Sequence, residues 1–128
     1  MYKIYIIEDD ANISRLITEQ LTKYQFQCYT VQQFHHIVEE FQAIQPHLLV
    51  MDINLPTYDG YFWSRKIRQL STCPIIIVSA RTHDIDQVYG IENGADDFMT
   101  KPFSLDVFMA KVNGLIRQKN WQSLYLSH

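Results

Sequence analysis

Short apolar segments alternate along this chain with longer segments in which apolar residues recur at helical spacing. The short segments, rich in β-branched and aromatic residues, cover residues 4–7, 26–30, 48–51 and 75–78, and a weaker one covers 97–99. Helical spacing marks the stretches 13–24, 34–41, 62–67, 85–92 and 105–116. Five strands alternating with five helices predict one α/β domain built on a parallel sheet.

Three of the expected strands are apolar almost throughout. Residues 4–7, 48–51 and 75–78 show no alternation of polar and apolar positions, which is typical of strands covered by helices on both faces. Gly94 is placed to end the fourth helix, and Ser104 is placed to cap the fifth. Residues 119–128 have no clear apolar period, and we expect a tail or the start of a linker there.

Composition limits what this domain can do. A chain of 128 residues has room for one hydrophobic core. The net charge of −3 is unlike that of a nucleic-acid-binding polycation. The sequence has neither an apolar segment of membrane-spanning length nor a signal peptide, so we expect a cytoplasmic protein with no membrane partner. Cys28 and Cys73 lack metal-binding spacing. Reduced thiols are favoured, although the sequence leaves a disulfide open.

Polar side chains follow four of the apolar segments. Glu8 and Asp9 follow the first, Asp52 the third, Ser79 the fourth and Lys101 the fifth. Because ligand sites of open parallel sheets lie outside the carboxyl ends of the strands, we expect these side chains to share one rim of the sheet.

The three acids of this group would repel one another unless a cation lay among them. Mg²⁺ prefers oxygen ligands and keeps several waters, so a few carboxylates and a phosphate oxygen suffice to bind it. The sequence has no GxxxxGK[ST] loop for nucleotide phosphates. The pattern therefore favours Asp52 as a carboxylate nucleophile for a phosphoryl group. Asp10 is interpreted as the acid that begins the first helix rather than as a metal ligand.

Five short motifs carry a resemblance to the response-regulator receiver domain over nearly the whole chain. In order they are Ile-Ile-Glu-Asp-Asp at 6–10, Asp-Ile-Asn-Leu-Pro at 52–56, Asp-Gly at 59–60, Ser-Ala-Arg at 79–81 and Gly-Ala-Asp-Asp-Phe-Met-Thr-Lys-Pro-Phe at 94–103. The resemblance implies a flavodoxin-like receiver fold. Its five-stranded parallel sheet has the order 2-1-3-4-5, with five helices on both faces.

The resemblance also implies a role for each matching residue. Asp52 would be the phosphoacceptor. Mg²⁺, or Mn²⁺ in its place, would be held by Glu8 (mainly through water), Asp9, Asp52 and the main-chain carbonyl of Asn54. Ser79 would be the switch hydroxyl, Lys101 the phosphate-binding amine and Phe98 the switch aromatic. The side chains of Asn54 and Arg81 would flank the phosphoryl group, and the peptide bond between Lys101 and Pro102 would be cis.

The segment before Lys-Pro-Phe resembles the OmpR/PhoB group, and residues 55–63 resemble the Bce/Gra-type regulators of bacitracin and antimicrobial-peptide resistance. This resemblance implies a receiver domain at 1–120 and a tail or linker start at 121–128. In such regulators a C-terminal winged-helix domain, absent from this chain, binds DNA. The implied partners are a sensor histidine kinase and a second copy of the chain. The chain would not be an enzyme beyond its own phosphorylation and slow dephosphorylation.

In that group the homodimer face is formed by the fourth helix, fifth strand and fifth helix. Asp97 could there pair with Lys111 of the other subunit. An Arg expected on the fourth helix is Gln87 here, and its acidic partner position is Val107, so apolar contacts would replace one ion pair. The residues assigned to this face are Glu92, Asp96, Asp97, Val107, Phe108, Lys111 and Arg117.

Three other functions fit parts of the pattern. A haloacid-dehalogenase-like phosphatase also uses an Asp nucleophile, but such enzymes place it after the first strand with an acid two positions later, where this chain has Asn54. A stand-alone receiver would signal by protein contact or relay phosphate without DNA binding. A pseudo-receiver would bind a partner without phosphorylation, which the intact acid cluster disfavours.

Overall fold

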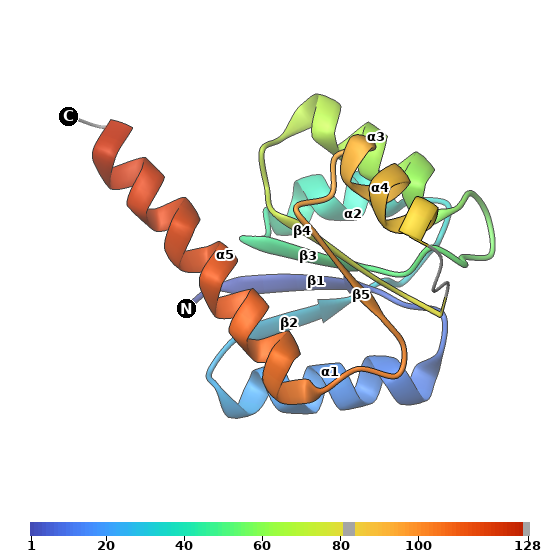
Figure 1. Cartoon of the computed structure of the whole chain (residues 1–128), viewed down its shortest axis with the longest axis horizontal. Coiled ribbons are helices and arrows are strands. Elements are labelled where there is room, and N and C mark those ends of the chain that lie inside the picture. Colours follow the sequence, from blue (N-terminus) through green and yellow to red (C-terminus); the bar gives the residue numbers. More distant parts are fainter. Residues whose placement is uncertain (81–83, 127–128) are drawn as a thin grey trace.

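The computed structural model describes residues 1–80 and 84–126, with side chains described within 1–80 and 87–119. The strands form one parallel sheet in the order β2-β1-β3-β4-β5, which confirms the fold predicted from the sequence (Figure 1). The strands are β1 (Lys3–Ile7), β2 (Gln27–Thr30), β3 (Leu48–Met51), β4 (Ile75–Ser79) and β5 (Asp97–Thr100). The helices are α1 (Ala11–Lys23), α2 (Ile37–Ile44), α3 (Gly60–Leu70), α4 (Asp84–Glu92) and α5 (Leu105–Leu126).

Successive residues of each central strand enter two different cores, because side chains alternate across a strand. Tyr5 and Ile7 of β1 belong to the core beneath α2 and α3, whereas Ile4 and Ile6 belong to the core beneath α1 and α5. In Figure 1, α1 and α5 cover one face, and α2, α3 and α4 cover the other. The uniformly apolar strands are thereby buried on both faces, as their sequence predicts.

Several helix boundaries follow from local chemistry. The Asp10 carboxylate caps α1 by accepting hydrogen bonds from the main-chain N–H groups of Asn12 and Ile13, which confirms its interpretation as a helix-start acid. Gly94 follows α4 with a φ of +105°, a conformation that glycine adopts without strain. The Ser104 hydroxyl oxygen accepts the N–H of Val107, 3.3 Å away, at the start of α5.

Two boundaries differ from the sequence expectation. Helix α2 begins at Ile37 rather than near Phe34. The loop before it is fixed instead by Glu40, whose carboxylate accepts the N–H groups of Gln32 and Gln33. Helix α5 continues to Leu126, although no apolar period marks residues 119–126, because helix formation does not require an apolar stripe.

Across the described residues, none of the helices is long and apolar enough to cross a membrane.

Candidate functional site

The carboxyl ends of β1, β3, β4 and β5 place the polar residues at one rim of the sheet. The ladder continues one residue past β3 and β5, where Asp52 donates its N–H to Ile7 O (2.9 Å) and Lys101 donates its N–H to Ser79 O (2.7 Å). The main chain therefore fixes Asp52 beside β1 and Lys101 beside β4. This convergence is the one expected from the sequence.

Lys101 joins the two buried acids of the rim. Its Nζ lies 2.6 Å from Glu8 Oε1 and 3.2 Å from Asp52 Oδ2. Glu8 is 7% exposed and Asp52 is 6% exposed. Two carboxylates removed from water thus share one ammonium group, which offsets part of their desolvation cost.

The surroundings of Glu8 raise its pKa to about 7. Burial is the largest cause, and a hydrogen bond with the neighbouring Asp52 carboxylate adds to it, whereas the hydrogen bond from Lys101 acts in the opposite direction. Burial lowers the pKa of Lys101, but the hydrogen bond to Glu8 and the charge of Asp52 outweigh that effect, so its pKa is raised. The lysine is therefore held in its charged form.

The loop after β3 also contacts the Asp52 carboxylate. The Asn54 N–H donates to Asp52 Oδ1 across 3.3 Å, while the Asn54 side chain is exposed. Thr57, further along this loop, donates its hydroxyl to the Phe34 carbonyl at 3.1 Å. The loop is thereby tied to the one that follows β2.

The donor set at this rim suits a hard divalent cation. Glu8 and Asp52 are buried, and Asp9, which follows Glu8 in the sequence, is exposed. The Asn54 main chain contacts Asp52 from the loop after β3. Across the residues that the structure describes, no group of three or more Asp, Glu, His or Cys side chains is arranged to hold a metal by itself. The expected set depends instead on two or three carboxylates, one main-chain carbonyl and water, which is how Mg²⁺ is usually bound. Lys101 leaves the acids with an excess of negative charge that such a cation would offset.

Ser79 and Phe98 lie on the neighbouring strands β4 and β5. Ser79 is fully buried at the end of β4. Phe98 is half-buried, and its ring packs so close to α4 that a Cβ built on Gly90 would lie 3.1 Å from Phe98 Cδ2. Arg81, the remaining residue predicted to flank the phosphoryl group, lies outside the described residues.

The expected dimer face needs one correction, at Phe108. Phe108 is fully buried in the core beneath α1 and α5, so it cannot make contacts with a second chain; Val107, one residue earlier on α5, is 49% exposed. Within the single chain, Lys111 Nζ lies 2.8 Å from Asp97 Oδ2, and a pair between Asp97 and Lys111 of two subunits stays a prediction.

The other members of that face differ in their surroundings. Asp96 pairs with Arg68 of the same chain at 2.9 Å and accepts the N–H of Ile75 at 2.8 Å. Glu92 and Arg117 are exposed. The face itself stays a prediction.

Arg68 is an important residue that sequence reasoning missed. Its guanidinium group donates to the carbonyls of Gly94, Ser71 and Cys73 and to the Asp96 carboxylate. It thereby joins the end of α3 to the segments before β4 and β5. No local pattern distinguishes it from the exposed Arg65, because its partners are distant in sequence.

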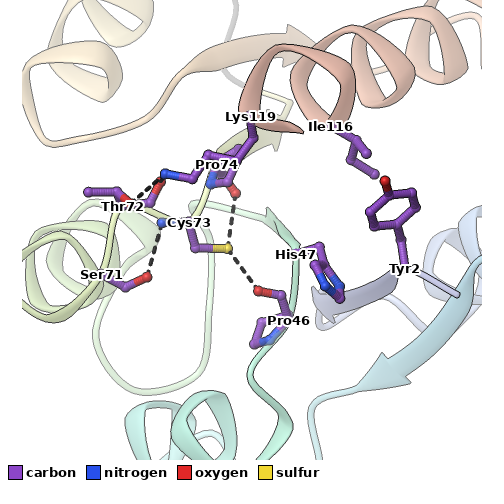
Figure 2. Close-up of a pocket in the computed structure, with 9 residues that line it drawn as sticks. All are labelled: Tyr2, Pro46, His47, Ser71, Thr72, Cys73, Pro74, Ile116 and Lys119. Carbon is purple, nitrogen blue, oxygen red and sulfur yellow. Dashed lines mark hydrogen bonds between the residues drawn. The ribbon is translucent and has the colours of Figure 1, made fainter. Parts of the chain in front are cut away.

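A cavity of about 180 Å³ lies at the opposite rim of the sheet, between the segments that precede β3 and β4 and helix α5 (Figure 2). Cys73 contacts the carbonyls of Pro46 and Pro74 there, and Lys119 of α5 donates to Thr72. Both Cys28 and Cys73 are free thiols, and burial raises the pKa of Cys73 to about 12. No carboxylate lines this cavity, so it is unrelated to the acid cluster.

Comparison with known protein families gives one match over most of the chain. The response regulator receiver domain model matches residues 4–113. Transcriptional regulatory protein YvcP of Bacillus subtilis is 46% identical over 118 residues, which cover 92% of this chain and 50% of that protein. Sensory transduction protein BceR of Halalkalibacterium halodurans is 42% identical, with 92% of this chain and 51% of that protein covered. The chain spans about half the length of these curated relatives.

Solved structures agree with this match. The N-terminal domain of the nisin resistance regulator NsrR, described as a lantibiotic response regulator, has a TM-score of 0.83 and 38% identity, covering 91% of this chain and 98% of that one. The BeF3-activated N-terminal receiver domain of Klebsiella pneumoniae RstA has a TM-score of 0.86 and 27% identity, covering 90% and 98%.

Proposed function

Because the chain belongs to the response regulator receiver domain family, we propose that Asp52 accepts a phosphoryl group from a sensor histidine kinase. One observation carries this assignment. Asp52 is a buried carboxylate at a strand end, and its only ammonium partner among the described residues is Lys101, which it shares with Glu8. A carboxylate in this setting can act as a nucleophile whose product is stabilised by the same lysine.

In the proposed step an Asp52 carboxylate oxygen forms a bond to phosphorus while the bond from phosphorus to the donor nitrogen breaks. The electron pair of the broken bond stays with the donor histidine, which takes up a proton. Lys101 Nζ contacts both Glu8 and Asp52. From this position the ammonium group can bind a phosphoryl oxygen on Asp52 and stabilise its developing negative charge. Water later hydrolyses the acyl phosphate and restores Asp52.

Receiver domains generally bind Mg²⁺ at the phosphorylation site. In this chain Asp9, Asp52 and the main-chain carbonyl of Asn54 would hold it directly, with Glu8 mainly through water, and Mn²⁺ could replace it. When bound, the cation offsets the negative charge of the carboxylates and of the phosphoryl oxygens.

Phosphorylation replaces the single negative charge of the Asp52 carboxylate with a phosphoryl group of charge about −2. We propose that the Ser79 hydroxyl moves toward that charge and that the Phe98 ring fills the space it leaves. Phe98 contacts α4 at Gly90, so this rearrangement would be transmitted to the helix face of α4, β5 and α5.

The output proposed for this face is a two-fold homodimer. Glu92, Val107 and Arg117 provide exposed side chains on α4 and α5, and opening the ion pair between Asp97 and Lys111 would free both groups for a partner. Sedimentation of the chain with and without BeF3 tests this proposal, and an unchanged monomer would contradict it.

The relatives are named as transcriptional regulatory and sensory transduction proteins, which supports a role in transcription control through an attached DNA-binding domain of the OmpR/PhoB type. The name of the relative BceR also supports the Bce/Gra subtype. We place the protein in the cytoplasm and expect no turnover of phosphate esters beyond its own acyl phosphate.

The deciding experiment is incubation of the chain with Mg²⁺ and acetyl phosphate, followed by intact-mass measurement. Wild type should gain one phosphoryl group and Asp52→Asn none. Asp10→Asn is a matched control, because Asn caps a helix as well as Asp. A wild type that gains no phosphoryl mass would exclude the proposed function.

A further inference from the structure

We propose that Gly60 is a positioning residue for Asp52. The first turn of α3 packs directly against the main chain of Asp52 and thereby determines where its carboxylate lies. This inference rests on the proposed role of Asp52 as phosphoacceptor.

The contact between the two residues leaves no room for a side chain. Gly60 is the first residue of α3 and is buried. A Cβ built on it would lie 2.3 Å from the main-chain oxygen of Asp52 and 3.0 Å from both Asp52 C and Ile53 Cα. Such a distance to a carbonyl oxygen is far below van der Waals contact, so any other residue must displace main-chain atoms.

On the α3 side the main chain is held in place. Gly60 donates its N–H to the Ile53 carbonyl at 2.9 Å. Asp59 caps the helix by accepting the Phe62 N–H at 2.9 Å, and the neighbouring Tyr61 and Trp63 are buried. The first turn of the helix therefore cannot withdraw without losing its cap or disturbing the core.

On the Asp52 side the strand end is also fixed. Asp52 donates its N–H to Ile7 at 2.9 Å, and Met51 and Ile53 on either side are fully buried. Strain introduced at Gly60 would consequently be taken up by the peptide between Asp52 and Ile53.

Movement of this peptide would alter the reactive carboxylate. Two contacts of the Asp52 carboxylate, with the Asn54 N–H at 3.3 Å and with Lys101 Nζ at 3.2 Å, are long for hydrogen bonds. A shift of a few tenths of an ångström would break either one. In-line phosphoryl transfer depends on the placement of the attacking oxygen, and an error of about 1 Å can cost about 100-fold in rate.

The experiment measures the rate of phosphorylation of the 128-residue chain by acetyl phosphate at saturating Mg²⁺, as a function of donor concentration. Gly60→Ala should lower the maximal rate by about 10- to 100-fold with little change in the half-saturating donor concentration. Gly114→Ala is the matched control, because a Cβ there meets nothing within 4 Å and the rate should stay at that of wild type. Circular dichroism gives the folded fraction, and rates are expressed per folded molecule, since a purely structural role would reduce only that fraction.

Should Gly60→Ala fail to fold, Asp59→Ala tests the same contact without adding an atom to it. This variant releases the first turn of α3 from its cap and should slow phosphorylation, and Asp59→Asn, which keeps the cap, should restore the rate. The inference is overturned if Gly60→Ala folds and reacts within about twofold of the wild-type rate, because so small a loss does not indicate misplacement of the carboxylate. It is also overturned if Asp59→Ala reacts as fast as wild type. Absence of phosphorylation in wild type overturns the proposed function and this inference with it.

Discussion

Lys101 Nζ lies 2.6 Å from Glu8 Oε1, although 93 positions separate the two residues in the sequence. The contact spans the sheet from the end of β1 to the segment after β5. Lys101 also reaches Asp52 at 3.2 Å, so one ammonium group serves two buried acids.

Replacing Lys101 with Met should destabilise the chain. Both acids would lose their cationic partner in a buried setting, and breaking such a pair costs about 3–5 kcal/mol. Urea unfolding without divalent cations measures the change. The loss should be smaller when Glu8→Gln is also present, because the two residues interact directly. A loss below about 0.5 kcal/mol, which is typical of exposed sites, would contradict this prediction.

Stability should fall as pH rises from about 4.5 to about 7, because the pKa of Glu8 is raised from its ordinary value of 4.5 to about 7, mainly by burial. The folded chain holds this proton more tightly than the unfolded chain does. The contribution is therefore fully present below the unfolded pKa and is lost as pH rises through the folded pKa.

The measurement is the free energy of unfolding at several pH values with a chelator present. Wild type should lose about 1–3 kcal/mol more than Glu8→Gln across this range. Parallel curves for the two proteins would show that Glu8 does not titrate in this way.

Magnesium should stabilise the folded chain. A ligand at about 100 times its Kd adds about 2.7 kcal/mol to the free energy of unfolding. Asp9→Asn should remove most of this gain, whereas Asp10→Asn should keep it, since Asp10 caps α1. The measurement is thermal unfolding at increasing Mg²⁺, and an equal gain in wild type and Asp9→Asn would exclude Asp9 as a ligand.

Arg68→Lys should cost about 2–3 kcal/mol. Lysine cannot reproduce the forked donors that reach Gly94, Ser71, Cys73 and Asp96, and carbonyls left without partners are costly. Arg65→Lys is the matched control on the same helix, because Arg65 makes, among the described residues, one exposed hydrogen bond, to Asn93. Denaturant unfolding of both variants gives the comparison, and equal losses would contradict the special role of Arg68.

The sequence predicted the sheet and the rim because both depend on local patterns. Uniformly apolar strands must be covered on both faces, and polar residues at their carboxyl ends then meet at one rim. The approach of Glu8, Asp52 and Lys101 needed no further information.

Other features depend on contacts that no local pattern reveals. Phe108 is an exception, because it shares the helical spacing of Met109 and Val112 and is buried with them, so the apolar period itself places it in the core. Lys111 could pair with Asp97 of its own chain or of another, since both choices satisfy the same charges. Arg68 acquires its role only from partners in segments that the fold brings together.

The length of α5 gives small movements at the rim a mechanical consequence. The helix begins at Leu105, four residues after Lys101, and has 22 residues, so it spans about 33 Å (Figure 1). A tilt of about 5° at its first turn displaces its last turn by about 3 Å over that length. The first turn of α5 follows the lysine of the acid cluster closely in the sequence. A small change in the angle of that turn would therefore produce its largest displacement at the other end of the helix.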